Sequence, residues 1–131
     1  MKRIALYWEY SRPFTLLPPL LGMVSGAVTA YGAEARVLGG LGAVWERHGA
    51  TDLLWVLVGA MMASTLNAAS NILNQLCDLE NDRVNKPHRP LPSGRVTVRE
   101  TAVLFTVLYA AALALAGAIR PRGARECFPI V

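Results

Sequence analysis

The chain has 131 residues, 53% of them hydrophobic and only 17% charged, with a formal net charge of +4. Soluble domains carry about 25% charged residues, so the composition excludes an ordinary soluble enzyme and a disordered chain. The two cysteines form neither a CxxC motif nor a Cys/His cluster, so neither a disulfide scaffold nor a zinc site is indicated. The basic residues flank apolar runs, a pattern that favours membrane topology over nucleic-acid binding.

Three uncharged runs concentrate the apolar residues: Pro13–Ala33, Leu53–Cys77 and Thr101–Ile119. A transmembrane helix needs about 20 predominantly apolar residues, and each run meets this requirement. The sequence therefore predicts an all-α integral membrane protein with three transmembrane helices within residues 1–119, placed in the cell membrane. Residues 120–131 are expected to form an atypical basic tail.

The first run contains two local features. Pro18 and Pro19 predict a kink, which a membrane span tolerates where neighbouring helices satisfy the freed carbonyls. Gly22 and Gly26 form a GxxxG pattern, a weak signal for close approach of another helix. A cleaved signal peptide is disfavoured, because the apolar stretch exceeds the roughly 7–15 residues of a signal sequence and Glu9 precedes it.

Lysine and arginine counts predict the orientation of the spans. The N-terminal leader and the loop after the second run share a side and carry eight basic residues: Lys2, Arg3, Arg12, Arg83, Lys86, Arg89, Arg95 and Arg99. The first loop carries Arg36 and Arg47, and the three arginines of the tail raise that side to five. The N-terminus and the second loop are therefore expected in the cytoplasm. His48, alone in the first loop, is interpreted as a solvated side chain.

Five polar residues at the end of the second run share one helical face: Asn67, Asn71, Asn74, Asp78 and Asp82. Their spacings of 4, 3, 4 and 4 keep them within an arc of roughly 80°. Polar groups at membrane depth usually face a bundle interior or an aqueous cavity. For Asn67 and Asn71 the sequence favours hydrogen bonds that hold helices together, although Asn71 is also a candidate for substrate binding. For the last three residues it favours a chemical role.

Asn74, Asp78 and Asp82 place one amide and two carboxylates on successive helical turns, about 6 Å apart along the axis. Mg²⁺ prefers such oxygen ligands and is usually held by one or two carboxylates plus substrate phosphates. The proline-rich loop that follows contains Lys86 and Arg89, which are suited to neutralise phosphate oxygens. The combination predicts a magnesium and diphosphate site at the end of the second span.

At these residues the sequence resembles the UbiA-type intramembrane prenyltransferases. Asn74, Asp78 and Asp82 look like the family's first aspartate-rich motif, and residues 85–94 look like the loop that follows it. The resemblance implies Mg²⁺-dependent transfer of a prenyl group from a prenyl diphosphate to an aromatic or other lipophilic acceptor, through an allylic cation. It implies that Asp78 and Asp82 hold the metal, with Asn74 supporting them. The implied substrate contacts are Lys86, Arg89, Arg12 and Asn71.

The sequence departs from the family in two ways. Many members have Asp directly after the motif's Asn, where this chain has Gln75. Asn-Gln is similar to the homogentisate-type branch, whereas residues 89–94 resemble the ubiquinone, chlorophyll and archaeal-lipid branches, so the acceptor stays open. Family members also have about nine helices and a second aspartate-rich motif. The expectation is therefore the first third of a longer bundle, inactive alone and lacking its C-terminal part.

A second hypothesis, from a different class of function, also stays open. The chain could be a small non-catalytic membrane protein that binds a divalent cation or a partner helix bundle through its polar face and its GxxxG pattern. Prenyl-transfer assays with Mg²⁺ separate the two hypotheses: product lost in Asp78→Ala and Asp82→Ala favours the enzyme, and neither turnover nor binding favours the non-catalytic protein.

Overall fold

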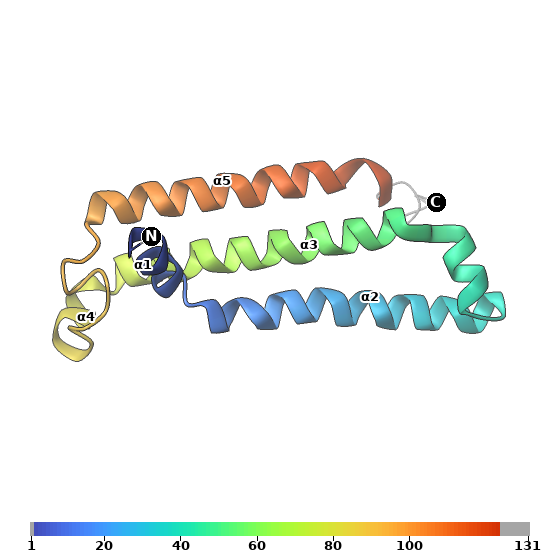
Figure 1. Cartoon of the computed structure of the whole chain (residues 1–131), viewed down its shortest axis with the longest axis horizontal. Helices are drawn as coiled ribbons and strands as arrows, with labels where there is room; N and C mark the ends of the chain where they lie inside the picture. The colour runs from blue at the N-terminus through green and yellow to red at the C-terminus, as the bar shows by residue number, and fades with distance from the viewer. Residues whose placement is uncertain (1, 124–131) are drawn as a thin grey trace, which may run out of the picture.

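The computed structural model describes residues 2–123, and they are almost entirely helical (Figure 1). The elements in chain order are α1 (Lys2–Tyr10), the 3₁₀ turn η1 (Pro13–Leu16), α2 (Leu17–Leu38), α3 (Leu41–Cys77), α4 (Leu79–Asn85) and α5 (Val98–Gly123). No strand occurs among these residues. The predicted all-α fold is confirmed.

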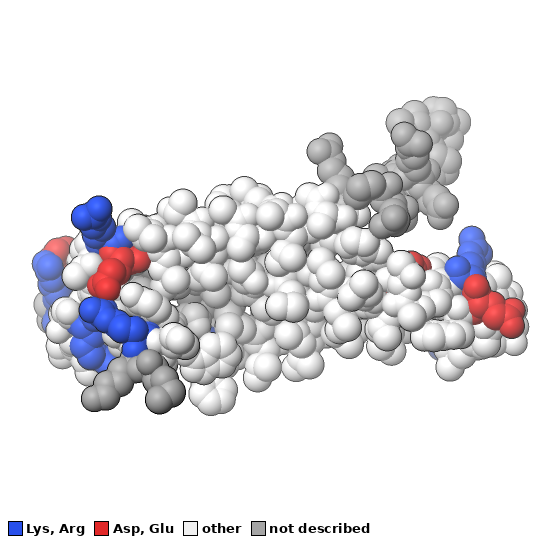
Figure 2. All heavy atoms as spheres, turned by 45° about the horizontal axis from the view of Figure 1, so that its top comes forward, with Lys and Arg blue, Asp and Glu red and all other residues white. Residues whose placement is uncertain are grey.

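Three segments are long and apolar enough to cross a membrane: Pro13–Leu38, Leu41–Cys77 and Val98–Ile119. Each contains one of the three predicted runs. Helix α3 lies between α2 and α5 and packs against both (Figure 1). On the face seen in Figure 2, the coloured charged side chains gather at the two ends of the bundle, and the long middle stretch is uncharged. This distribution fits a bundle whose middle lies in hydrocarbon.

The predicted kink at Pro18 and Pro19 is wrong. These prolines lie in the first turn of α2, where backbone N–H groups have no intrahelical partner and proline is tolerated. A break occurs instead in α3 at Gly49, whose φ of 64° and ψ of −166° are not helical. Glycine permits this conformation because it lacks a Cβ. The break separates residues 41–48 from the membrane-spanning part of α3.

The predicted basic tail, residues 120–131, overlaps the end of α5 and stays a prediction. Residues 120–123 of the predicted tail continue α5 as helix. Residues 124–131 lie outside the described part of the chain.

Helix packing involves a glycine other than those of the GxxxG pattern. A Cβ at Gly59 of α3 would lie 3.0 Å from the side chain of Met23, so α2 and α3 approach closely there. A Cβ at Gly22 or Gly26 would meet no atom within 4 Å in the described structure. The GxxxG face is therefore open toward whatever surrounds the bundle.

The hydrophobic core lies at one end of the bundle, beside α4. Its centre is formed by Tyr10, Ile72, Leu91 and Val96, which come from α1, α3 and the loop after α4. Side chains of α5 pack against it from the other side. By contrast, no residue of α2 is fully buried. Tyr10, whose hydroxyl is hydrogen-bonded to Thr101 of α5 at 3.0 Å, thus belongs to the core.

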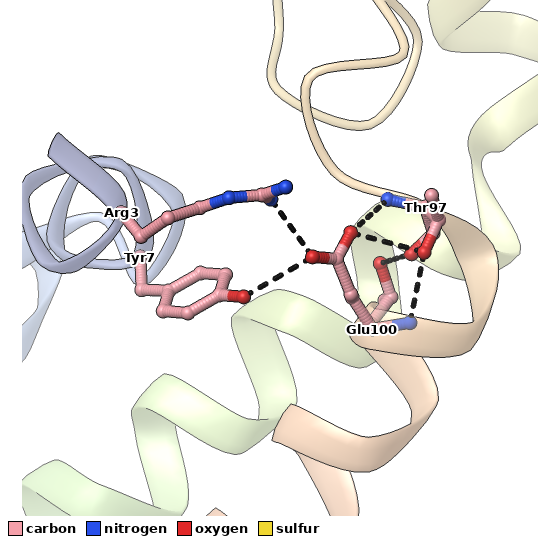
Figure 3. Close-up of polar contacts among 5 residues, drawn as sticks. Arg3, Tyr7, Thr97 and Glu100 are labelled. Carbon is pink, nitrogen blue, oxygen red and sulfur yellow. Dashed lines mark hydrogen bonds and ion pairs between the residues drawn. The ribbon is translucent and has the colours of Figure 1, made fainter.

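Helix α1 crosses this end of the bundle and is fastened to α5 by a polar cluster (Figure 3). Arg3 forms an ion pair with Glu100 at 2.8 Å, and the Tyr7 hydroxyl donates to the same carboxylate at 3.3 Å. The other Glu100 oxygen accepts from the backbone N–H of Thr97, while the Thr97 hydroxyl accepts from the Glu100 N–H. This reciprocal pair is a capping box, which fixes where α5 begins.

Candidate functional site

The predicted metal ligands keep one helical register across the junction of α3 and α4. The backbone N–H of Asp78 donates to the carbonyl of Asn74 at 2.9 Å, and that of Asp82 donates to the carbonyl of Asp78 at 2.8 Å. Helix α3 ends at Cys77 and α4 starts at Leu79, but the interruption does not move these residues out of register. The three side chains therefore lie on successive turns, as the spacing predicted.

Their environments differ sharply. Asn74 and Asp78 are exposed, whereas the side chain of Asp82 is only 1% exposed. Arg89 donates a charged hydrogen bond to Asp82 Oδ2, and Lys86 Nζ lies 3.7 Å from Asp82 Oδ1. Two of the predicted substrate contacts are thus assembled around one of the predicted ligands.

The charges at Asp82 determine its protonation. Burial acts to raise the pKa of this carboxyl group. Burial is the largest single influence, but the hydrogen bond from Arg89 and the positive charges of Arg89, Lys86 and Arg12 together outweigh it. The pKa of Asp82 therefore lies below its usual value, and the group is a carboxylate at neutral pH.

Arg12 reaches this site from a different part of the chain. It is the second of the two residues between α1 and η1, and its φ of 56° places it in the left-handed region that non-glycine residues rarely adopt. The turn is held by hydrogen bonds from Arg12 N to the Glu9 carbonyl and from Thr15 N to the Arg12 carbonyl. Arg12 is half-buried, and its charge acts on Asp82.

The loop that carries Lys86 and Arg89 is anchored to the core rather than free. Leu91 and Val96 are buried, at 5% and 1% exposure, and the Val96 N–H donates to the Pro90 carbonyl. Gly94 has a φ of 76°, a conformation that favours glycine at this turn. The loop is also tied to α1, because Arg95 forms an ion pair with Glu9 at 2.9 Å. The backbone around Arg89 is therefore well supported.

Three amides of α3 hold the junction between α1 and α2. Asn67 donates to the Thr15 carbonyl at 2.6 Å, and Asn71 donates to the Thr15 hydroxyl at 2.7 Å and to the Ser11 carbonyl. Buried Gln75 donates to the Tyr10 carbonyl at 3.0 Å. The helix-joining interpretation of Asn67 and Asn71 is confirmed, while substrate binding by Asn71 stays a prediction.

The oxygen donors present suit Mg²⁺ in type and number. Within residues 2–123, no group of three or more His, Cys, Asp and Glu side chains is arranged to hold a metal ion. Magnesium needs only one or two carboxylates when substrate phosphates supply other ligands. Asp78 and Asn74 are accessible for this purpose. Asp82 fits as a ligand only if the guanidinium of Arg89 leaves its carboxylate.

A second ionic cluster lies at the opposite end of the bundle, where α2 connects to α3. His48 Nδ1 is 2.6 Å from Asp52, and Nε2 is 2.6 Å from Glu34. Arg47 lies 3.4 Å from the other Glu34 oxygen, and the Tyr31 ring lies beside the imidazole. The interpretation of His48 as merely solvated is wrong, because the chain reversal brings Glu34 within reach of it.

Sequence reasoning missed the groups that position the site. The Thr97-x-x-Glu100 capping box carried a readable signal, a threonine three residues before a glutamate at a helix start. Gln75 could have been found from the spacing of four residues that relates it to Asn71 and Asn67. The contacts of Glu9 with Arg95 and of Tyr10 with Thr101 had no local signal, since more than 80 residues separate the partners.

Comparison with known sequences identifies the protein family to which the chain belongs. The profile of the UbiA prenyltransferase family matches residues 35–124. The chain belongs to the UbiA prenyltransferase family. The resemblance inferred from residues 74–94 is thereby confirmed. The family match includes α3, α4, the basic loop and the described part of α5.

Named relatives agree with this assignment. The chain is 32% identical over 124 residues to digeranylgeranylglyceryl phosphate synthase of Methanopyrus kandleri, covering 95% of this chain and 38% of the relative. It is 34% identical over 88 residues to the bacteriochlorophyll synthase 33 kDa chain of Rhodobacter capsulatus, covering 67% and 24%. A digeranylgeranylglyceryl phosphate synthase of Korarchaeum cryptofilum is 28% identical over 115 residues, covering 88% and 34%. The chain thus spans well under half the length of these relatives. No solved structure gives a significant match.

Proposed function

We propose that this chain forms the diphosphate-binding part of a Mg²⁺-dependent prenyltransferase, which moves a prenyl group from a prenyl diphosphate to an aromatic or other lipophilic acceptor. The observation that carries the proposal is the pairing of Lys86 and Arg89 with Asp82, one turn from exposed Asp78, with the charge of Arg12 also acting on Asp82. Membership of the family supports prenyl transfer in general. The names of the relatives include both a glyceryl phosphate and a bacteriochlorophyll product, so the acceptor is left at the level of its class.

Each residue of the site has a part in this proposal. Asp78 and Asp82 hold the metal with Asn74 beside them, and a bound Mg²⁺ would neutralise the diphosphate and assist its departure. Lys86, Arg89 and Arg12 bind the phosphate oxygens, since cationic hydrogen-bond donors bind phosphate strongly. These positive charges stabilise the negative charge that develops on the diphosphate as its bond to the prenyl group breaks. This lowers the barrier to bond cleavage.

The location of the site follows from the same proposal. The end of the bundle that carries α1, α4 and the basic loop faces the cytoplasm, where the positive-inside rule places it. Diphosphate enters from water at this end, and the prenyl chain extends into the bilayer along the apolar helices. The expectation that the chain is inactive without a C-terminal part of the same enzyme stays a prediction.

Binding and transfer assays on membranes that contain the 131-residue chain test the proposal. Radiolabelled prenyl diphosphate is added with and without Mg²⁺ to wild type, Asp78→Ala and Asp82→Ala. Glu80→Ala is the matched control, because Glu80 is an exposed carboxylate of α4 that pairs only with its surface neighbour Arg83 in the described structure. We expect Mg²⁺-dependent binding that is lost in Asp78→Ala and kept in Glu80→Ala.

The outcomes separate the two classes of function. Product that disappears in the aspartate variants indicates an enzyme, and binding without turnover indicates a half-site. Absence of both binding and turnover in the wild type contradicts the proposal and favours the non-catalytic membrane protein. Because Asp82→Ala also removes a buried ion pair, it can disturb folding. The decisive variant is therefore Asp78→Ala, since the side chain of Asp78 is exposed.

A further inference from the structure

Asp82 is closed to a metal ion in the described structure. Its carboxylate is 1% exposed, with Arg89 Nη1 hydrogen-bonded to one oxygen and Lys86 Nζ 3.7 Å from the other. Asp78 and Asn74, one and two turns earlier, are exposed. A metal ion that approaches this face therefore finds two accessible donors and one whose negative charge is already compensated.

We propose that Arg89 is the resident counter-cation of Asp82 in the metal-free chain and keeps this carboxylate closed until a diphosphate draws the guanidinium away. The inference rests on the proposed function, which supplies the metal and the diphosphate. It assigns Arg89 two successive partners, first the carboxylate and then the phosphate. Arg89 is thus a switch between the empty and the loaded site.

The chemistry of the guanidinium allows the exchange. Its planar fork of N–H donors matches carboxylate and phosphate equally well, so leaving one for the other conserves the charged hydrogen bonds. Leaving Asp82 without any cation would be costly, because a buried unpaired charge is strongly destabilising. A metal ion that replaces the guanidinium removes this cost. Exchange is therefore favourable only when metal and phosphate arrive together.

The fold around Arg89 allows its side chain to move while its backbone stays. The loop is fixed by buried Leu91 and Val96 and by the ion pair of Arg95 with Glu9. The Arg89 side chain itself is 21% exposed, so it borders the solvent from which a diphosphate would come. Rotation about side-chain bonds is sufficient for the exchange.

A linkage follows from this competition. Since Arg89 opposes the metal at Asp82, a diphosphate that binds Arg89 must raise metal affinity, and the metal must raise diphosphate affinity by the same factor. Coupling of this kind typically amounts to about 5- to 150-fold. The site would thus bind bare divalent cations weakly and bind the metal–diphosphate pair tightly.

Titration with Mn²⁺ alone, followed by electron paramagnetic resonance of the free ion, tests this inference on the full 131-residue chain in nanodiscs. We expect Arg89→Gln to bind Mn²⁺ roughly 5- to 150-fold more tightly than wild type. Arg83→Gln is the matched control, because it removes the same charge near the site, but Arg83 is exposed and pairs with Glu80 instead of Asp82. It should leave Mn²⁺ affinity within about twofold of wild type.

Further variants make the outcome decisive. Arg89→Lys keeps a cation beside Asp82 and should give an intermediate affinity even if Arg89→Gln perturbs folding. In an Asp82→Asn background, Arg89→Gln should have no effect. If wild type, Arg89→Lys and Arg89→Gln bind Mn²⁺ equally tightly, and adding Asp78→Asn abolishes binding in each, the switch is overturned. The proposed function then stays intact. Absence of any Mn²⁺ binding that depends on Asp78 overturns the proposed function and the switch with it.

Discussion

The two ends of the helix bundle each pair carboxylates with basic side chains, but in different proportions. Beside α4, Arg12, Lys86 and Arg89 act on the single carboxylate of Asp82. At the far end, His48 lies between the carboxylates of Glu34 and Asp52, and Arg47 pairs with Glu34, so two basic side chains meet two carboxylates. Surplus positive charge next to exposed oxygen donors suits a phosphate and a metal. Carboxylates that are already paired with basic side chains suit a structural role, in which they hold two segments of the chain together.

The ends also differ in packing. The only core cluster in residues 2–123 lies at the α4 end, where α1, α3, α5 and the basic loop converge on Ile72. At the far end Val44 is the buried apolar residue, and Gly49 breaks the helix beside it. A rigid site next to a packed core can hold charges at fixed positions, which a loosely packed end cannot do.

The largest effect on stability is expected from a cavity in the hydrophobic core at the α4 end. Ile72→Ala should lower the free energy of unfolding by about 2–5 kcal/mol, because Ile72 is fully buried and a cavity would replace it. Leu57→Ala, at a position 48% exposed on the same helix, should change it by about 0.5 kcal/mol or less. Unfolding in mixed detergent micelles measures both. Equal effects would show that the core is not confined to one end.

A smaller effect is expected from the amide that supports the α1 junction. Gln75→Leu should cost about 1–3 kcal/mol, because the buried Tyr10 carbonyl loses its donor. The neighbouring exposed amide gives the opposite pattern. Asn74→Ala should leave stability nearly unchanged and weaken Mg²⁺-dependent prenyl-diphosphate binding. Stability and binding measured on both variants check this, and a loss of both properties in both variants would remove the distinction between support and site.

Acid pH should release the basic loop from Asp82 late in a titration. Because the pKa of Asp82 is lowered in the folded chain, its contribution to stability is present above the unfolded value near 3.8 and is lost as pH falls through the lower folded value. Hydrogen exchange of residues 86–96 should therefore stay slow until the pH is below about 3.8. Asp82→Asn should abolish this pH dependence. Release well above that pH in wild type would contradict the ion-pair geometry.

The smallest effect on ligand binding is expected at the far end. His48→Gln removes the imidazole between Glu34 and Asp52, so hydrogen exchange of residues 41–52 should speed up. Mg²⁺-dependent prenyl-diphosphate binding should stay within about twofold of wild type, since the cluster lies at the opposite end of the spans. A large loss of binding would show that the two ends are coupled.

Some of this structure could be read from the sequence because it depends on local periodicity. Uninterrupted apolar runs gave the three spans, and the spacing of Asn74, Asp78 and Asp82 predicted a register that the backbone hydrogen bonds reproduce. Helix geometry alone determines both features.

Other parts depend on contacts between distant segments. The different burial of Asp78 and Asp82 arises because the loop folds back and places Arg89 against only one of them. The role of Gln75 depends on where α1 ends, and the role of His48 depends on the return of the chain after Glu34. The sequence pattern of one segment does not indicate which distant residue will contact it. The prolines were misread for a related reason, since their effect depends on where the helix begins.

Photo-crosslinking can locate the bound diphosphate, which we propose lies at the α4 end of the bundle. A prenyl diphosphate analogue that carries a benzophenone on its first isoprene unit, next to the diphosphate, is irradiated with the full chain in nanodiscs, with and without Mg²⁺, and the labelled peptides are identified by mass spectrometry. We expect Mg²⁺-dependent labelling near residues 71–95 that unlabelled diphosphate suppresses and Asp78→Ala abolishes. Labelling that centres on residues 31–52, or that is indifferent to Mg²⁺ and to Asp78, would contradict it.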